Sequence, residues 1–206
     1  DVRDKNGGVA ADLRYGSYRI YPGKKPLNGL PAAYGNEKDV DTLEIDLRDE
    51  VSGLVVTLRY SVFAQWDVIA RSAEIFNRGT GVLILERALS CCLDEPVPAS
   101  RDILTFYGRH MGERNLERMP LRHGKFRVDS MRGASSPHHN PFVIMCDRAA
   151  TETAGNCWAF SLVYSGNFMA QAEVDQIDTL RFVMGIAPQN FGWELTPGAS
   201  FQAPEV

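Results

Sequence analysis

Hydrophobic and polar residues alternate one by one along much of the chain. The clearest case is the run Leu-Glu-Ile-Asp-Leu at residues 43–47, in which Glu44 and Asp46 separate three aliphatic residues. Successive side chains of a β-strand point to opposite faces of its sheet. The run therefore predicts a strand with the aliphatic residues buried and with Glu44 and Asp46 on a solvated face.

Two hairpins are expected around this strand. Residues 54–63 again place aliphatic and aromatic side chains at every second position, and the turn at 49–53 contains a glycine that can take positive φ. Residues 67–76 and 82–89 form the next pair of apolar runs. They are separated at 77–81 by Asn-Arg-Gly-Thr-Gly, residues typical of a tight turn, so a second hairpin is predicted there.

Shorter apolar runs continue to the end of the chain at intervals typical of a β-sandwich or barrel. No stretch of twelve residues shows a clean helical stripe, which makes the expected class all-β. No linker or repeat interrupts the pattern, so residues 1–206 are predicted to form a single domain. The further strands are expected at residues 104–107, 125–131, 142–146, 157–164, 168–174, 180–184 and 191–195.

Residues 108–120 stand out because acidic and basic side chains are mixed within ten positions. One interpretation is a solvated edge strand whose charges discourage pairing with other sheets. The other is an interface in which arginine–carboxylate pairs bridge to a neighbouring domain.

Composition excludes several classes of protein. The 206 residues carry 22 Lys+Arg against 26 Asp+Glu, a net charge of −4, without a basic cluster, so nucleic acid is not expected as a partner. No apolar run approaches the ~20 residues of a spanning helix, so no membrane is expected either. Nucleotide-binding and nucleophile-elbow glycine motifs are absent, and no cofactor is expected.

The four cysteines, Cys91, Cys92, Cys146 and Cys157, do not form a C-x-x-C pair. Zinc and thioredoxin-like sites are therefore disfavoured, and buried reduced thiols are the main expectation. A hairpin disulfide between Cys146 and Cys157 is the alternative.

His138 and His139 lie in the proline-rich stretch 135–141, which is typical of a loop. No cluster of further ligands supports a metal site, so hydrogen bonds that order the loop are expected, with general-base chemistry as the alternative. The tryptophans Trp66, Trp158 and Trp193 are expected to face inward, although they could instead form a platform for sugar stacking.

Four stretches resemble motifs of the glycoside hydrolase family 36 α-galactosidases. Residues 132–142 are similar to the family's R-G-x-S-S-x-x-x-N-P-F, and residues 162–168 to its L-V-Y-S-G-N-F. Residues 185–193 and 195–205 resemble its G-I-N-P…F-x-W and L-x-P-G…F-x-T-P-E. The departures are Ala187 in place of Asn, Ala203 in place of Thr, and the Cys91-Cys92 doublet.

This resemblance implies the antiparallel two-sheet β-supersandwich of the family's N-terminal domain, which is similar to galactose mutarotase. It also implies a parent enzyme that hydrolyses α-galactosides such as melibiose and raffinose with retention. The family's two catalytic aspartates lie on a (β/α)₈ barrel whose motifs have no counterpart here. Residues 1–206 are thus expected to form a partial, inactive portion without catalytic, metal-binding or cofactor-binding residues.

The resemblance implies that the partners are the catalytic barrel of the same polypeptide, the α-galactoside substrate of the full enzyme, and other copies in a homo-oligomer. The alternatives are a free-standing carbohydrate-binding module and a mutarotase-like enzyme that uses His138 or His139. The chain contains no Asn-x-Ser/Thr acceptor, which favours a cytoplasmic or bacterial setting, and a cytoplasmic location is expected.

Overall fold

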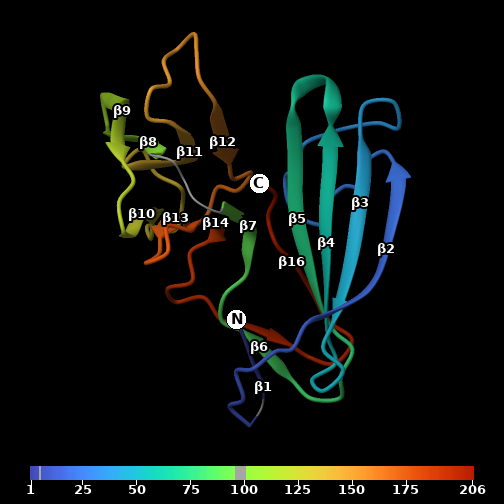
Figure 1. Ribbon diagram of the computed structural model, residues 1–206. Coiled ribbons are helices and arrows are strands. Elements are labelled where there is room, and N and C mark those ends of the chain that lie inside the picture. The colour runs from blue at the N-terminus through green and yellow to red at the C-terminus, as the bar shows by residue number, and fades with distance from the viewer. Residues whose placement is uncertain (5, 96–100) are drawn as a thin grey trace. The chain divides into compact units, whose positions relative to one another are not determined.

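The protein is built from antiparallel strands, which divide into two compact units (Figure 1). The computed structural model describes residues 1–4, 6–95 and 101–206. Unit 1 comprises residues 1–90 and 188–206, and unit 2 comprises residues 91–187. Helix among the described residues is limited to a 3₁₀ turn at Ala64–Trp66, and none of it is long and apolar enough to cross a bilayer. The all-β prediction is confirmed.

Unit 1 contains a five-stranded sheet in the order β16-β5-β4-β3-β2. The predicted hairpin at residues 43–63 is present, with Leu43 opposite Tyr60. Gly53 has a φ of 74°, as its turn requires. The strand bounds are Arg14–Pro22 for β2, Asp41–Arg48 for β3, Leu54–Phe63 for β4, Val68–Asn77 for β5 and Ser200–Gln202 for β16.

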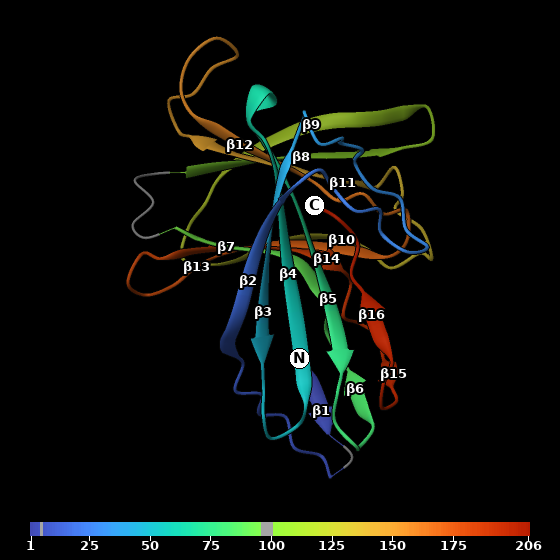
Figure 2. The same cartoon turned by 90° about the vertical axis from the view of Figure 1, so that its right-hand side faces the viewer.

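The second predicted hairpin is wrong. β5 does not pair with the run that follows it. On the side away from β4 it pairs with β16, in which Phe201 lies opposite Ile75. The next run divides into β6 (Leu83–Leu85) and β7 (Leu89–Glu95). β6 lies between β1 (Val2–Asp4) and β15 (Trp193–Leu195) in a three-stranded sheet (Figure 2). Both β5 and β6 therefore pair with strands that are distant in the sequence instead of pairing with each other.

The glycine-rich turn after β5 packs against the turn between β3 and β4 instead of closing a hairpin. A Cβ atom on Gly53 would lie 2.4 Å from the backbone of Gly79, and one on Gly79 would lie 2.2 Å from the carbonyl oxygen of Ser52. The amide of Arg78 donates to the carbonyl of Gly53 at 2.8 Å. Residues 77–81 therefore pack backbone to backbone on the β3–β4 turn, which requires glycine at both positions.

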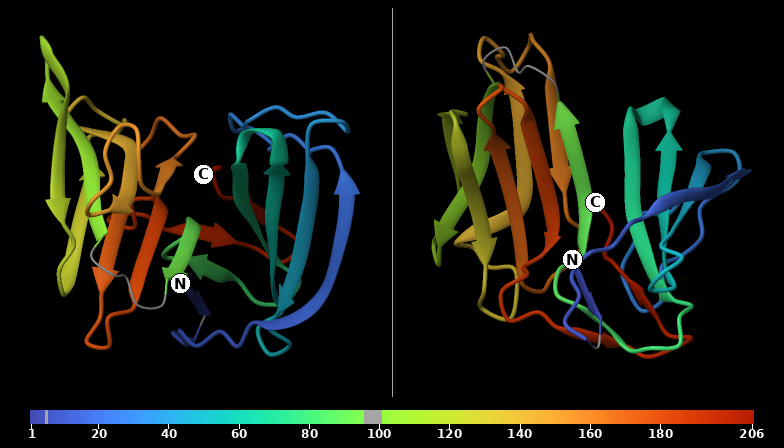
Figure 3. Two further views of the ribbon diagram at one scale, coloured as in Figure 1. Left: turned by 45° about the horizontal axis from the view of Figure 1, so that its top comes forward. Right: turned by 60° about the horizontal axis from the view of Figure 1, so that its bottom comes forward.

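Unit 2 contains two four-stranded sheets, in the orders β12-β11-β8-β9 and β10-β13-β14-β7. The charged stretch 108–120 contributes β9, which forms an edge strand as one interpretation predicted. Figure 3 shows the β8–β9 hairpin as an extended yellow-green ribbon. The bounds are Arg101–Arg109 for β8, Gly112–Pro120 for β9, Gly124–Ser130 for β10, His139–Asp147 for β11, Cys157–Ser161 for β12, Phe168–Val174 for β13 and Leu180–Ile186 for β14.

Apolar side chains form the core of unit 2. The rings of Phe160 on β12 and Phe182 on β14 lie 4.3 Å apart between centroids, so the two sheets are in direct contact. Val143, Phe168 and Met184 are fully buried. This packing of two antiparallel sheets through interdigitating side chains is the arrangement of a β-sandwich.

The close approach of the two turns gives a stability prediction. We expect Gly53→Ala to lower the free energy of unfolding by on the order of 3 kcal/mol, because positive φ and a backbone clash act together. Gly29 is a matched control, since its φ is 72° and no atom lies within 4 Å of the position that a Cβ would take. Gly29→Ala should cost only about 1 kcal/mol. Urea unfolding measures both, and equal losses would contradict the packing argument.

Candidate functional site

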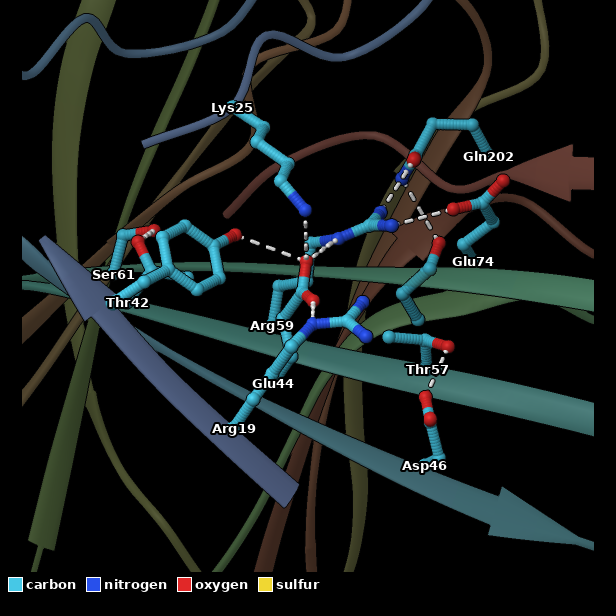
Figure 4. A network of polar contacts seen from close by, with 12 residues as sticks. Arg19, Lys25, Thr42, Glu44, Asp46, Thr57, Arg59, Ser61, Glu74 and Gln202 are labelled. Atoms are coloured by element: carbon cyan, nitrogen blue, oxygen red, sulfur yellow. Dashed lines mark hydrogen bonds and ion pairs between the residues drawn. The ribbon is translucent and has the colours of Figure 1, made fainter. Parts of the chain in front are cut away.

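One face of the five-stranded sheet is polar on every strand. The cross-strand register places alternate residues of the five strands in rows, and Figure 4 shows the network that they form. This face contains the two acidic residues that the sequence predicts to be solvated. Its residues are Ser17, Arg19, Tyr21, Thr42, Glu44, Asp46, Thr57, Arg59, Ser61, Ser72, Glu74 and Gln202.

The prediction that Glu44 faces solvent is wrong, because its residue is only 1% exposed. Its carboxylate accepts hydrogen bonds from Arg59 Nε at 2.8 Å, from the Tyr21 hydroxyl at 3.0 Å, and from Arg19. The ammonium group of Lys25 lies 3.7 Å away. A buried carboxylate is tolerated when it is paired with cations and its oxygens accept hydrogen bonds, and Glu44 has both.

Arg59 extends the network across the sheet. Its guanidinium group donates to Glu74 on β5 at 2.5 Å and to the side-chain oxygen of Gln202 on β16 at 2.9 Å. Arg19 reaches Glu44 from β2. One connected set of charged hydrogen bonds therefore links all five strands.

These contacts change the acidity of two groups. Burial alone would raise the pKa of Glu44, but the hydrogen bonds from Arg59, Tyr21 and Arg19 outweigh it and hold the pKa below its usual value. Burial and the hydrogen bond to Glu44 raise the pKa of Tyr21 from 10.0 to about 12. Glu44 therefore stays ionised and Tyr21 stays protonated at neutral pH.

A second buried ion pair lies beside this network. The ammonium group of Lys24 is 2.7 Å from the carboxylate of Glu205, and both side chains are almost fully buried. The amide of Ala33 also donates to this carboxylate at 3.3 Å. The hollow that Lys24, Glu205, Tyr21 and Arg59 line together has a volume of about 10 Å³. It has too little room for a sugar.

The opposite face of the same sheet is apolar and only partly covered, because Ile75 and Phe201 are buried there whereas the residues on β2 are exposed. Leu43, Ile45 and Leu58 are only half-buried, although the alternation predicts burial of the aliphatic residues in 43–47. Tyr18 is 64% exposed and Ile20 66% exposed beside them on β2. We call this surface the apolar sheet face. It consists of Tyr15, Tyr18, Ile20, Leu43, Ile45, Leu47, Val56, Leu58, Tyr60, Val62 and Ile69.

A hollow of about 540 Å³ lies elsewhere in unit 1, and Asp4, Asp49, Arg78 and Thr80 are among the residues that line it. The carboxylate of Asp4 accepts hydrogen bonds from the amides of Asn6 and Gly8. That of Asp49 accepts them from the turn that follows β3. Both acidic groups are therefore used to order turns. None of the described residues that line this hollow is aromatic.

The histidine loop is tied to the second motif of the chain. The amide of Gly133 donates to the side-chain oxygen of Asn167 at 2.7 Å, and the amide of Ser135 donates to the carbonyl of Ser165. The amide of His138 donates to the hydroxyl of Ser136. These contacts order residues 133–138, as the sequence predicts. The predicted loop is too long, however, because β11 (His139–Asp147) begins at His139, and the side-chain atoms His139 Nδ1 and Asn140 Oδ1 are buried without a hydrogen-bond partner. The described residues contain no group of three or more metal-ligating side chains.

Each of the three tryptophans has a different neighbouring side chain. Trp66 contacts Phe63, Trp158 lies under the guanidinium group of Arg101, and Trp193 contacts Phe201. The three residues are 57%, 39% and 49% exposed, so the prediction that they face inward is wrong. All three lie on short or edge elements, which leave part of each side chain exposed.

All four cysteines are thiols, but two are not buried as predicted. Cys91 and Cys146 are buried, whereas Cys92 and Cys157 are exposed. Alternation along a strand accounts for the doublet, because Cys91 and Cys92 are neighbours on β7 and point to opposite faces.

The sequence interpretation did not identify Glu44, Arg59, Lys24 or Glu205 as residues that act together. A signal exists in the alternating polar positions of 57–61, which continue the period of two on the face that carries Glu44. The contact of Lys24 with Glu205 joins positions 181 residues apart, for which local pattern gives no signal.

The charge network gives a prediction with a pH signature. We expect Glu44→Gln to lower the free energy of unfolding by roughly 3 kcal/mol at pH 7, because Arg59 then loses its buried counter-charge. The folded-state pKa of Glu44 lies below its usual 4.5, so this stabilisation is present above that pH and is lost as the pH falls through the folded value. The variant should therefore lose less stability than wild type on acidification.

Asp46→Asn is the matched control, because Asp46 lies on the same face and accepts bonds from the hydroxyls of Ser17 and Thr57. Asp46→Asn should lower the free energy of unfolding by less than about 1 kcal/mol. Chemical unfolding between pH 3 and pH 7 measures both variants. Parallel pH curves for wild type and Glu44→Gln would contradict the assigned network.

Comparison with known proteins agrees with the motifs and the fold. The family model for the glycosyl hydrolase family 36 N-terminal domain matches residues 1–196. The α-galactosidase AgaA of Geobacillus stearothermophilus is 49% identical over 206 residues, and its crystal structure superimposes with a TM-score of 0.97 over 99% of this chain. The bifunctional α-galactosidase/sucrose kinase AgaSK of Mediterraneibacter gnavus is 45% identical.

The chain spans only part of these relatives. It matches 28% of the length of AgaA and 22% of the length of AgaSK. The fold, the order of the motifs and the match over nearly the whole chain agree. The chain belongs to the N-terminal domain family of the family 36 glycoside hydrolases.

Proposed function

We propose that this chain is the non-catalytic N-terminal β-domain of an α-galactosidase. The parent enzyme would hydrolyse terminal α-galactosides such as melibiose and raffinose with retention, and its catalytic barrel would lie outside these residues. AgaA, 49% identical to this chain, has been solved in a complex with raffinose as a doubly substituted variant, which supports this substrate class. The domain would support the barrel and the assembly of the enzyme.

The closed charge network carries the non-catalytic part of the proposal. Retaining glycoside hydrolysis needs two carboxyl groups about 5 Å apart that face a substrate. Glu44 and Glu205 are instead paired with cations beside a hollow of about 10 Å³. Asp4 and Asp49 hold backbone amides. These carboxylates are occupied in keeping strands and turns in place.

The apolar sheet face carries the supporting part of the proposal. Exposed Tyr18 and Ile20 on β2 adjoin half-buried aliphatic residues on the two neighbouring strands β3 and β4, which makes one contiguous surface. Contiguous apolar patches on a protein surface typically mark an interface. Since this chain covers 28% of the length of AgaA, we assign the surface to the remaining part of such a polypeptide.

The carbohydrate-binding module is the weaker alternative. Its supporting observation is the exposure of Trp66, Trp158 and Trp193. Sugar recognition uses aromatic rings beside converging polar groups, whereas the hollow of about 540 Å³ has polar lining residues without an aromatic ring among those described. The cytoplasm remains the proposed location, in keeping with four cysteines that are all thiols.

Activity measurements test the assignment of catalysis. We expect no hydrolysis of a nitrophenyl α-galactoside by the purified chain, and no sub-millimolar binding of galactose, melibiose or raffinose by calorimetry.

A chimera in which this chain replaces the matching residues of AgaA should hydrolyse raffinose within about tenfold of the natural enzyme, because the two domains share one fold. Turnover by the chain alone would refute the proposal, and tight sugar binding would favour the module.

Surface variants test the apolar sheet face. The isolated chain should self-associate at high concentration, and Tyr18→Ser with Ile20→Asn should reduce this while leaving Tm nearly unchanged, because both side chains are exposed. Tyr34→Ser is the matched control, since Tyr34 is 87% exposed and lies outside the sheet. In the AgaA chimera the double variant should lower Tm. Light scattering that shows a monomer at all concentrations would count against the docking role.

A further inference from the structure

Two cysteines lie directly opposite each other on neighbouring strands. β11 and β12 are antiparallel, and their register pairs Cys146 with Cys157. Side chains of directly opposed residues project from the same face of a sheet, so the two thiol groups lie on one side. The other two cysteines, Cys91 and Cys92, are adjacent in sequence and lie on another strand.

The hydrogen-bond pattern fixes the kind of position that they occupy. The amide of Asp147 donates to the carbonyl of Asn156 at 3.0 Å, and the amide of Leu162 donates to the carbonyl of Pro141 at 3.0 Å. Both bonds join directly opposed residues, and hydrogen-bonded pairs alternate with non-hydrogen-bonded pairs along an antiparallel ladder. Cys146 and Cys157 are one step from Asp147 and Asn156, which makes them a non-hydrogen-bonded pair.

This position suits a disulfide. Opposed residues of a non-hydrogen-bonded pair have Cα atoms about 4.5 Å apart, the closest approach in a sheet. Disulfides join cysteines whose Cα atoms are about 4.4–6.8 Å apart. The pair can therefore be bridged without a change of register.

The two thiols differ in access, which sets the order of reaction. Cys157 is exposed and lies on β12, the edge strand of its sheet, whereas Cys146 is buried at 4% exposure on β11. A small reagent in solution therefore reaches Cys157 first. Cys146 is placed to react from within the protein.

We propose that Cys146 and Cys157 form a reversible cross-strand disulfide, with a low-molecular-weight disulfide such as oxidised glutathione as the oxidant. The Cys157 thiolate attacks one sulfur of the oxidant, forms a mixed disulfide and releases one glutathione. The Cys146 thiolate then attacks the Cys157 sulfur and releases the second glutathione. The two protein thiols lose two electrons, the oxidant gains them, and each released thiol takes up one of the two protons.

The bond would lock the edge of the sheet. It closes the hairpin that connects β11 with β12, where the side chain of Asn156 already donates to Asp147 at 2.9 Å. Closing a loop of this size restricts the unfolded chain and stabilises the folded one. Reduction would return the edge strand to its ordinary stability.

The experiment treats the whole chain with oxidised glutathione and maps the product by mass spectrometry. The expected product is a monomer that has lost two hydrogen masses, with Cys146 and Cys157 in one cross-linked peptide, and dithiothreitol should reverse it. The oxidised form should have a Tm higher by roughly 5–10 °C. Cys91→Ala with Cys92→Ser should give the same product, since neither residue takes part.

The matched control transfers the exposed thiol from position 157 to position 159, which lies on the same face of β12. Ala159 is exposed, lies two positions from Cys157 on β12, and is paired with Ile144 instead of Cys146. In Cys157→Ser with Ala159→Cys, oxidation should stop at the mixed disulfide, because diagonal residues are about 7–8 Å apart. A mixed disulfide as the final product of the wild-type chain, or a dimer linked through Cys157, would overturn the proposal. Wild-type mapping decides the question even if a variant fails to fold.

Discussion

The burial of Glu44 is the constraint on which unit 1 depends. A carboxylate out of water is stable only while cations and donors surround it, and here they come from neighbouring strands of the same sheet. A slip of one residue in the register of β3 would move Glu44 to the opposite face, and Arg59 would lose the more deeply buried of its two carboxylate partners. The charge network therefore specifies one register for strands that come from both ends of the chain, including β16.

The network also reverses the burial that the sequence predicts for Glu44, which lies on the polar face of the sheet. The polar face holds the buried Glu44 with its charge paired, whereas the aliphatic residues of β3 and β4 on the other face are only half-buried and adjoin the exposed Tyr18 and Ile20. The result is a sheet whose polar groups are largely paired with one another (Figure 4) and whose apolar face is partly exposed. These features support the proposed role in binding another protein surface, because sugar recognition needs polar groups that are not already satisfied.

The two edge strands of the β12-β11-β8-β9 sheet differ in the side chains that they expose. β9 carries mixed charges on exposed positions, a device that discourages strands from adding to an edge. β12 is five residues long and carries Cys157 opposite a buried thiol. One edge is thus protected by electrostatics, whereas the other can be fixed by a covalent bond.

Local sequence pattern predicts the all-β class, most strand positions, the hairpin at 43–63 and the family, because alternation, turn residues and motifs are properties of neighbouring positions. It leaves the charged stretch 108–120 open between an edge strand and an interface, and β9 (Gly112–Pro120) is an edge strand. Contacts between distant parts of the chain determine that β16 and not β6 pairs with β5, that β1 and β15 flank β6, and that Lys24 binds Glu205. They also determine which face of the sheet is buried. Period-two alternation distinguishes two faces but does not say which one is covered, since that depends on cations and segments supplied from distant parts of the chain.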